Sequence, residues 1–224
     1  MASVVEVWRY PVKSMAGERL DSCAVGENGL EGDRRWALVD GTPNRAGKPL
    51  TIREEARLMT YRARLVGGVV EILAPGGEVR RLDEAALSHL AEESARPLTL
   101  RDLAGANFDD SPVLLVNLAT IAAFEAEAGM RVDRRRFRAN LYVDGFEPSE
   151  EIAWLGRRVA VSGIELEVVK RCERCVVITR DPDTTVATPS LLRVLNETHE
   201  MFMGVYCEVR RSGRVAVGDP VHVG

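Results

Sequence analysis

Short runs of β-branched and aromatic residues, separated by glycine, proline, asparagine or aspartate, recur along most of the chain and constrain its fold more than any other feature. They predict strands over residues 4–9, 19–25, 36–39, 59–65, 69–73, 79–82, 98–101, 113–116, 139–143, 159–162, 164–169, 175–179, 205–210 and 221–223. Two alternating runs meet at Pro75-Gly76-Gly77 and predict a hairpin over residues 67–82.

Only three segments of the sequence favour helices. Each starts at a residue suited to a helix N-terminus: Asp83 for a helix to about Glu93, Asn117 for a helix over residues 118–128, and Thr188-Pro189 for a helix to about Thr198. Few, separated helices among many strands favour a β-barrel with helical insertions over repeated βαβ units. The predicted class is therefore mainly β with helical insertions (α+β).

Composition narrows the classes of function. The chain of 224 residues is 46% hydrophobic, and its formal net charge of −4 argues against a nucleic-acid binder with a broad basic field. No stretch approaches the roughly 20 apolar residues of a membrane span, and the start lacks the apolar core of a signal peptide. We expect a cytoplasmic protein without a membrane span or a nucleic-acid partner. A weak boundary near Leu103–Asn107 predicts domains over residues 1–103 and 104–224, with strands of the first segment available to complete the barrel of the second.

The segment Arg171-Cys172-Glu173-Arg174-Cys175 holds two of the four cysteines. Structural zinc needs four ligands, yet no second cysteine pair exists and the three histidines are scattered. Thioredoxin-type chemistry needs the first cysteine at a helix N-terminus, whereas this pair leads into the strand-like run VVIT. The spacing therefore favours neither a complete zinc site nor a dithiol redox motif.

An extended segment would place Cys172 and Cys175, an odd number of residues apart, on opposite sides of a strand. One thiol would then point into the core and the other into a site, where Arg171, Arg174 and Arg180 would favour a thiolate. A single thiolate in a cationic pocket suits a soft metal centre or a nucleophile. Burial of both thiols as small hydrophobic groups is an equal alternative, and the spacing leaves the two open.

Five arginines fall within residues 131–138, just before a predicted strand. In an acidic chain this cluster concentrates guanidinium groups suited to bidentate binding of phosphate or carboxylate, although a solvated charge run would need no ligand. Arg138 and Asn140 have the same parity where the strand begins, so both can face one pocket. The cluster favours a site for an anionic ligand and is too local to indicate nucleic acid.

A second set of cationic residues lies near the amino terminus. Lys13 and Ser14 follow the first predicted strand in a loop that closes at Gly17. A cation, a hydroxyl and exposed backbone N–H groups can together hold phosphate, although the glycine spacing of a P-loop is missing. Arg34 and Arg35 enter another strand on opposite faces, so one of them can reach the same pocket.

Taken together, seven segments in this order resemble the MOSC family, named for the C-terminal domain of molybdenum cofactor sulfurase. The similar members carry an additional amino-terminal β-barrel domain and include amidoxime-reducing proteins. The segments are YPVKSMAG, DRRW, LTIREEARL, DDSPVLLVN, RRFRANLYVDG, CERCVVITRDPDT and the terminal VGDPVHV. The resemblance implies a MOSC-type β-barrel plus a smaller amino-terminal β-barrel-like domain.

The resemblance also implies a molybdenum–molybdopterin cofactor, whose metal is held by the pterin dithiolene and one protein thiolate. By position in the CERC motif that thiolate is Cys175, the implied catalytic residue and metal ligand, while Cys172 does not ligate. The other positions that match cofactor contacts of the family are Lys13, Ser14, Arg34, Ser111, Arg138, Asn140 and Arg174. Guanidinium and ammonium groups suit the terminal phosphate of such a cofactor.

The implied activity is that of a molybdenum-dependent oxidoreductase that reduces N-hydroxylated compounds, such as amidoximes and hydroxylamines, by oxygen transfer from nitrogen to the metal. Electrons would come from a separate reductase or ferredoxin-like protein, because the chain lacks a cysteine set for an iron–sulfur cluster. The alternative is a sulfur-carrier or cofactor-binding module that uses a persulfide on Cys175. Pyridoxal phosphate binding, also linked to this type of barrel, lacks a lysine in a Schiff-base context.

Two residues near the implied ligand depart from the family pattern. Thr185 stands where glycine is common after DPDT, so a turn that needs a positive φ there would be strained. Glu173 places a negative charge between the cysteines, where small residues are frequent. We expect Glu173 to influence the potential of the site or its preference among substrates.

Overall fold

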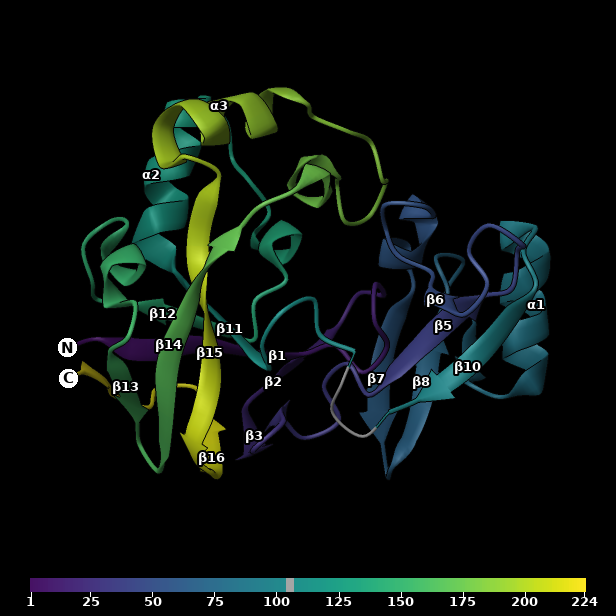
Figure 1. Cartoon of the computed structure of the whole chain (residues 1–224), viewed down its shortest axis with the longest axis horizontal. Coiled ribbons are helices and arrows are strands. Elements are labelled where there is room, and N and C mark those ends of the chain that lie inside the picture. Colours follow the sequence, from purple (N-terminus) through teal and green to yellow (C-terminus); the bar gives the residue numbers. More distant parts are fainter. Residues whose placement is uncertain (104–106) are drawn as a thin grey trace.

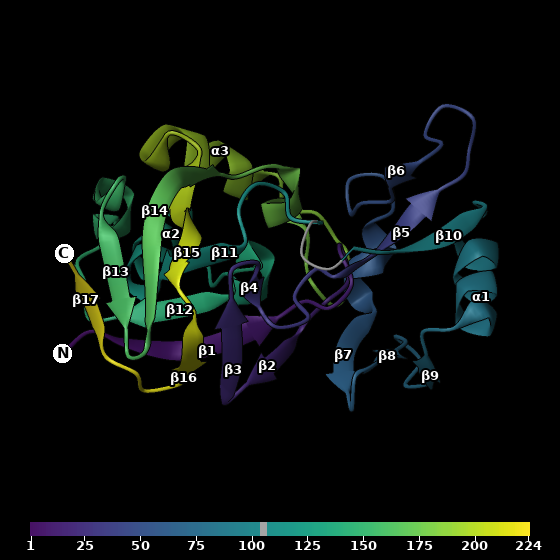
Figure 2. The same cartoon turned by 60° about the horizontal axis from the view of Figure 1, so that its bottom comes forward.

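The structure, a computed structural model, describes residues 1–103 and 107–224, which form two lobes that lie side by side (Figure 1). The larger lobe contains an eight-stranded sheet, and the smaller lobe contains two three-stranded sheets. Both termini lie at the outer end of the larger lobe, as Figure 1 and Figure 2 show. The predicted domain boundary after residue 103 adjoins residues 104–106, which lie outside the described residues, so this boundary stays a prediction.

The strands of the large sheet follow the order β17, β13, β14, β15, β11, β12, β1, β2, with β11 and β12 parallel and the other neighbouring pairs antiparallel. Their bounds are β1 Ser3–Arg9, β2 Glu18–Leu20, β11 Val113–Asn117, β12 Leu141–Asp144, β13 Arg158–Val161, β14 Ile164–Glu173, β15 Phe202–Arg211 and β17 Val221–Val223. The sheet curls into a half-barrel, which confirms the predicted mainly β class with helical insertions.

Three smaller sheets complete the described β structure. The first, β3 Ser22–Gly26, β4 Gly29–Leu30 and β16 Gly213–Ala216, shares a hydrophobic cluster with the large sheet. The other two form the smaller lobe: β5 Trp36–Asp40, β6 Lys48–Pro49 and β10 Leu98–Asp102, and β7 Arg62–Val66, β8 Val69–Leu73 and β9 Val79–Arg81. Strands β8 and β9 pair around the predicted Pro75-Gly76-Gly77 turn, so the predicted hairpin is confirmed.

All three predicted α-helices are present: α1 Glu84–Ser94, α2 Leu118–Ala128 and α3 Ser190–His199. The side chains of Asp83 and Asn117 accept backbone N–H groups at the starts of α1 and α2, as predicted. Four short 3₁₀ helices also occur in the described ranges: η1 Ala56–Thr60, η2 Arg134–Phe137, η3 Glu150–Trp154 and η4 Val176–Thr179. No helix within residues 1–103 or 107–224 is long and apolar enough to cross a membrane.

Strand β11 shows how the large sheet is packed. Its Val113 and Leu115 join the hydrophobic cluster of the half-barrel, while Leu114 and Val116 join a second cluster with residues of α2 and α3. Both faces are therefore covered, which explains why every residue of β11 is buried. Because the faces are filled by apolar side chains, the loops at the ends of the strands are left to form a polar site.

The prediction of a strand over residues 175–179 is wrong, because η4 takes its place. The hydroxyl of Thr179 donates to the carbonyl of Val176 at 2.7 Å, and Arg136 donates to the carbonyls of Ile178 and Thr179. These bonds occupy carbonyls that a sheet partner would otherwise pair. The β propensity of the run Val-Val-Ile-Thr is thus overridden by a guanidinium from a distant segment.

Three other predicted strands include turn residues, and the strands predicted over 164–169 and 205–210 are longer, at Ile164–Glu173 and Phe202–Arg211. The segment 59–65 begins within η1 and is a strand only from Arg62 onward. The segment 139–143 becomes a strand at Leu141, and the segment 19–25 divides into β2 and β3. Each of these predicted runs joined a strand to an adjoining turn.

Candidate functional site

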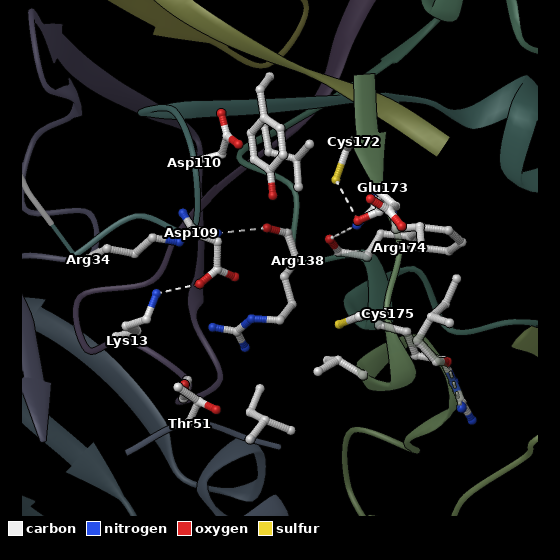
Figure 3. A pocket seen from close by; sticks show the side chains of 18 of the residues that line it. Lys13, Arg34, Thr51, Asp109, Asp110, Arg138, Cys172, Glu173, Arg174 and Cys175 are labelled. Atoms are coloured by element: carbon white, nitrogen blue, oxygen red, sulfur yellow. Dashed lines mark hydrogen bonds and ion pairs between the residues drawn. The ribbon is translucent and has the colours of Figure 1, made fainter. Parts of the chain in front are cut away.

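A cavity of about 270 Å³ lies among loops from both halves of the chain (Figure 3). Its walls come from the loop after β1, the segments before β5, η1 and β11, the residues around η2, and the end of β14 with η4. All eight predicted site residues line it: Lys13, Ser14, Arg34, Ser111, Arg138, Asn140, Arg174 and Cys175. The fold therefore brings them together, while the role of each stays a prediction.

Two parts of the cavity differ in chemistry. The cation side consists of Lys13, Ser14, Arg34, Arg138 and Asn140, and the thiol side consists of Arg53, Cys172, Glu173, Arg174 and Cys175. In Figure 3, Lys13 and Arg34 lie at the left, the two cysteines lie at the right, and Arg138 lies between them. Over the whole cavity, seven lysine and arginine side chains outnumber three carboxylates, so a locally cationic site is embedded in an acidic chain.

Hydrogen bonds to neutral groups hold the two arginines of the cation side. Arg34 donates from Nη2 to the carbonyl of Arg138 at 3.0 Å and from Nη1 to Oδ1 of Asn140 at 3.2 Å. Arg138 donates from Nη1 to the carbonyl of Met15 at 2.8 Å. Arg34 also forms an ion pair with the buried Asp33. Carbonyl acceptors do not neutralise a guanidinium, so much of this positive charge is available to a ligand.

Three residues of the cation side have left-handed backbone although none is glycine. Their φ angles are 72° for Ser14, 48° for Arg34 and 55° for Arg138. Such a conformation costs about 1–2 kcal/mol per residue and is concentrated at functional sites in proteins. Strand alternation was the predicted reason why Arg138 and Asn140 face the same pocket. Both residues precede β12, however, and reach the cavity from a turn.

The cations of this side are partly desolvated. Lys13 forms an ion pair of 2.5 Å with Asp109 and donates to the carbonyl of Asn107 at 2.8 Å, yet burial lowers its pKa. Burial also lowers the pKa of Arg138, and the nearby charge of Arg34 acts in the same direction. No carboxylate in the described parts of the chain forms an ion pair with Arg138. A bound phosphate would supply the missing negative charge.

The arginine-rich segment contributes less to the cavity than the sequence predicts. Four of its five arginines form ion pairs with carboxylates outside the cavity: Arg131, Arg134, Arg135 and Arg136. Arg136 lines the cavity, but its Nη1 donates to the carbonyl of Thr179 at 2.7 Å and so supports η4. Arg138 has the guanidinium that ends in the cavity (Figure 3).

Cys175 carries the accessible thiol of this chain. The exposed fractions of Cys23, Cys172 and Cys207 are 4%, 2% and 0%, whereas Cys175 is half-buried. Its sulfur points into the cavity in which the Arg138 guanidinium ends (Figure 3). No group of three or more His, Cys, Asp or Glu side chains could hold a metal ion anywhere in the described residues. A metal ion here would therefore need one thiolate from the protein and its other ligands from a cofactor.

The prediction that one thiol points into the core and the other into a site agrees with the structure, but its premise of an extended strand through both cysteines is wrong, and both residues border the cavity. Strand β14 has an irregularity between Arg171 and Glu173 and ends at Glu173, so period-two alternation does not continue from Cys172 to the second cysteine. Cys172 is buried in the cluster beneath α2 and α3. Exposure, rather than strand parity, distinguishes the two thiols.

Arg53 is a lining residue that the sequence analysis did not single out. Its Nη2 donates to Sγ of Cys175 at 3.3 Å. Burial lowers the pKa of Arg53, but its interactions with Cys175 raise that pKa overall. The available signal was its place in the segment LTIREEARL, although no local pattern connects the smaller lobe with a cysteine of the larger one. Arg171 and Arg180, which were expected near the thiolate, do not line the cavity.

Lys170 and Tyr206 also line the cavity without having been predicted. They are paired neighbours on β14 and β15, and Lys170 forms an ion pair with Asp110 across the cavity wall. Burial raises the pKa of Tyr206, so its hydroxyl retains its proton at neutral pH. The pairing of β14 with β15 places Lys170 and Tyr206 together, and this pairing could not be predicted from the sequence.

Arg174 braces the thiol side. Its Nε donates to the carbonyl of Met203 at 2.9 Å and its Nη1 to the carbonyl of Phe137 at 2.8 Å. Its buried Nη2 has no hydrogen-bond partner among the described residues. The hydrogen bonds of Arg174 therefore link β15 and η2 to the end of β14. They leave its Nη2 as a hydrogen-bond donor without a partner in the described residues.

The turn after η4 has the predicted strain. Thr185 has a φ of 63°, in the left-handed region where glycine is common in the family pattern. The Asp181 carboxylate holds this turn by accepting the N–H groups of Asp183 and Thr184 and the Thr184 hydroxyl. Thr185 does not line the cavity, so its strain is separate from ligand contacts.

Comparison with known proteins agrees with the fold and the motifs. The MOSC domain model matches residues 77–222, and the model of the MOSC N-terminal beta barrel domain matches residues 1–111. The two matches overlap around the predicted domain boundary. Among solved structures, the YuaD protein from Bacillus subtilis has a TM-score of 0.56 at 17% identity, covering 100% of this chain and 96% of that chain, and shows the fold alone.

Curated relatives align over nearly the whole chain at low identity. Mitochondrial amidoxime reducing component 2 of Rattus norvegicus is 25% identical, covering 99% of this chain and 83% of that protein. Mitochondrial amidoxime-reducing component 1 of Homo sapiens is 24% identical, covering 100% and 83%. Molybdenum cofactor sulfurase of Caenorhabditis elegans is 28% identical, covering 91% of this chain and 33% of that protein. With the MOSC domain model matched over more than half of its length, the chain belongs to the MOSC domain family.

Proposed function

We propose that this chain is a molybdenum-cofactor-binding oxidoreductase that reduces N-hydroxylated small molecules such as amidoximes and hydroxylamines. One observation carries the proposal: the half-buried thiol of Cys175 borders the same cavity as the Arg138 guanidinium, which lacks a carboxylate partner in the described chain. A soft thiolate and a guanidinium without an ion-pair partner suit a metal–pterin group with a phosphate. The names of the amidoxime-reducing relatives support the substrate class.

The residues present fit such a group. Cys175 would supply the single protein ligand to the metal, and Lys13 and Arg138 would bind the phosphate. Asn140 makes most of its contacts within the protein, because its Oδ1 accepts from Arg34 and from the backbone of Leu114 and one N–H of its Nδ2 donates to a backbone carbonyl. Asn140 therefore holds Arg34 in place. When bound, the cofactor supplies two-electron redox chemistry that side chains lack.

Other lining residues act on the thiolate and on the substrate. Arg53 donates a hydrogen bond to Sγ of Cys175 and so stabilises the ligating thiolate. Tyr206 keeps a proton on its hydroxyl beside the cavity, and Glu173 and Lys170 place opposite charges where substrate choice can be tuned. Electrons would reach the site from a separate reductase or ferredoxin-like protein.

The proposal is tested by expression with molybdate, followed by elemental analysis for molybdenum and fluorescence analysis for oxidised pterin. The unaltered chain should contain both, and Cys175→Ser should lose the molybdenum because the only accessible thiolate is gone. Cys23→Ser, at a buried cysteine outside the cavity, is the matched control and should keep its molybdenum. Full molybdenum content and amidoxime reduction in Cys175→Ser would refute the assignment.

A second candidate is a sulfur carrier with a persulfide on Cys175. Its support is the similarity to molybdenum cofactor sulfurase together with the accessibility of this one thiol. Cyanide-releasable sulfur in a chain that contains no molybdenum would favour the carrier. Molybdenum without releasable sulfur would favour the reductase.

A further inference from the structure

Tyr10 is buried beside the cation side of the cavity, and its ring contacts both arginines there. Only 2% of its surface is exposed. The Cζ atom of Arg34 lies 4.8 Å from the ring centroid, and that of Arg138 lies 4.6 Å from it. Both distances fall within the range of about 6 Å for cation–π contacts. One aromatic ring therefore contacts two guanidinium groups.

Two half-buried guanidinium groups side by side need such a contact because like charges repel. Asp33 forms an ion pair with Arg34, whereas nothing acidic in the described ranges does so with Arg138. The negative face of an aromatic ring attracts a cation without cancelling its charge, as a carboxylate would. The ring can thus hold the arginines together and leave their charge available to an anion.

The surrounding residues prevent the Tyr10 ring from moving. Its backbone N–H donates to the Asp33 carboxylate at 2.7 Å, and its hydroxyl donates to the carbonyl of Ala139 at 3.3 Å. Its carbonyl accepts the N–H of Arg34 at 2.7 Å. A Cβ atom on Gly17 would lie 2.6 Å from Cδ1 of the ring, so this position has to be glycine for the ring to lie where it does. These contacts consequently fix the position of the Tyr10 ring relative to the Arg34 backbone.

We propose that Tyr10 is a positioning residue that keeps Arg34 and Arg138 together as a subsite for a phosphate group. This inference rests on the proposed function in taking an anionic cofactor as the ligand, but it requires neither the metal nor the thiol. The aromatic face of Tyr10 performs this role, while the hydroxyl contributes only a bond to a neighbouring carbonyl.

Inorganic phosphate is the probe, titrated by calorimetry at low ionic strength into the whole chain and its variants. Tyr10→Leu should weaken phosphate binding by about tenfold or more, because both cation–π contacts are lost. Tyr10→Phe keeps the ring and should restore the affinity of the unaltered chain. Phosphate affinity that is unchanged in a folded Tyr10→Leu variant, or absent from the unaltered chain, would overturn the proposal.

A second series keeps the test decisive if Tyr10→Leu folds poorly. Phenylalanine analogues of increasing fluorine content at position 10 weaken the negative ring face while nearly preserving its shape, so phosphate affinity should fall with each added fluorine. Equal affinities across this series would contradict a positioning role of the ring. Absence of molybdenum would overturn the proposed function but not this inference, because phosphate binding requires no metal.

Discussion

The cation side and the thiol side of the cavity are built differently. On the cation side, Ser14, Arg34 and Arg138 have left-handed backbone, and their side chains are held by hydrogen bonds and by the ring of Tyr10. On the thiol side, Cys175 has extended backbone just beyond the longest strands of the sheet. Positive charge is therefore positioned by strained turns, and the thiol is positioned by a strand end.

This difference in construction indicates that substitutions can alter one side of the cavity without altering the other. The cation side offers fixed charge to an anionic group, whereas the thiol side offers one soft ligand whose main polar contact is Arg53. A change on one side should leave the measured property of the other side intact. The following substitutions test that separation, beginning with the largest expected effect.

Cys175→Ser should abolish reduction of an amidoxime supported by an artificial electron donor, because the metal loses its protein ligand. Phosphate affinity of the same variant should equal that of the unaltered chain, since no residue of the cation side has changed. Calorimetric titration with inorganic phosphate measures this second property. Loss of both properties together would show that the sides are coupled.

Arg138→Gln should weaken phosphate binding by about 1.5–3 kcal/mol, or roughly 10- to 140-fold, because a charged hydrogen-bond donor is removed from a half-buried site. Alkylation of Cys175 by iodoacetamide should proceed as in the unaltered chain. Arg131→Gln is the matched control, because that side chain is 93% exposed and pairs with Glu125 outside the cavity. An equal loss of affinity in both variants would argue for a general charge effect.

Arg53→Gln should slow the alkylation of Cys175 severalfold at neutral pH, because the thiolate loses its charged hydrogen-bond donor. Peptide mass spectrometry follows the modification at this cysteine specifically. Arg57→Gln, on the same lobe but paired with Glu55, should leave the rate unchanged. An unaltered rate in Arg53→Gln would mean that the guanidinium contact does not activate the thiol.

Thr185→Gly should have the smallest effect, a gain of up to about 1 kcal/mol in the free energy of unfolding. Relief of left-handed strain favours glycine, while the greater freedom of glycine in the unfolded chain offsets part of the gain. Urea denaturation measures the change. Phosphate affinity and Cys175 alkylation should both stay constant, since Thr185 lies outside the cavity, and a decrease in stability would contradict the strain.

Much of the secondary structure could be predicted because its causes are local. Asp83, Asn117 and Gly129 act on the ends of α1 and α2 through contacts within a few residues, and the Pro75-Gly76-Gly77 turn similarly determines a hairpin. One exception is the run Val176–Thr179, where strand propensity is real but Arg136 donates to the carbonyls that a sheet would use.

The candidate site shows the same difference between what local sequence predicts and what contacts between distant segments determine. Motif resemblance identified Lys13, Arg34, Arg138 and Cys175, which all line one cavity. It did not identify Arg53 as a neighbour of the thiol or Tyr10 as the ring beneath two arginines, because both contacts join segments far apart in the chain. Exposure of Cys175 and burial of Cys172 likewise depend on where β14 loses its regular alternation.

By itself, then, the sequence determined the β-rich class, the helix ends and the set of charged and sulfur-bearing residues with a family resemblance. The tertiary structure alone decided which thiol is accessible in the cavity, which arginines are neutralised by carboxylates and which, among the described residues, form no ion pair. The physical reason is range: propensity and capping act within a few residues, whereas burial, ion pairing and cation–π contacts depend on groups that only folding brings together.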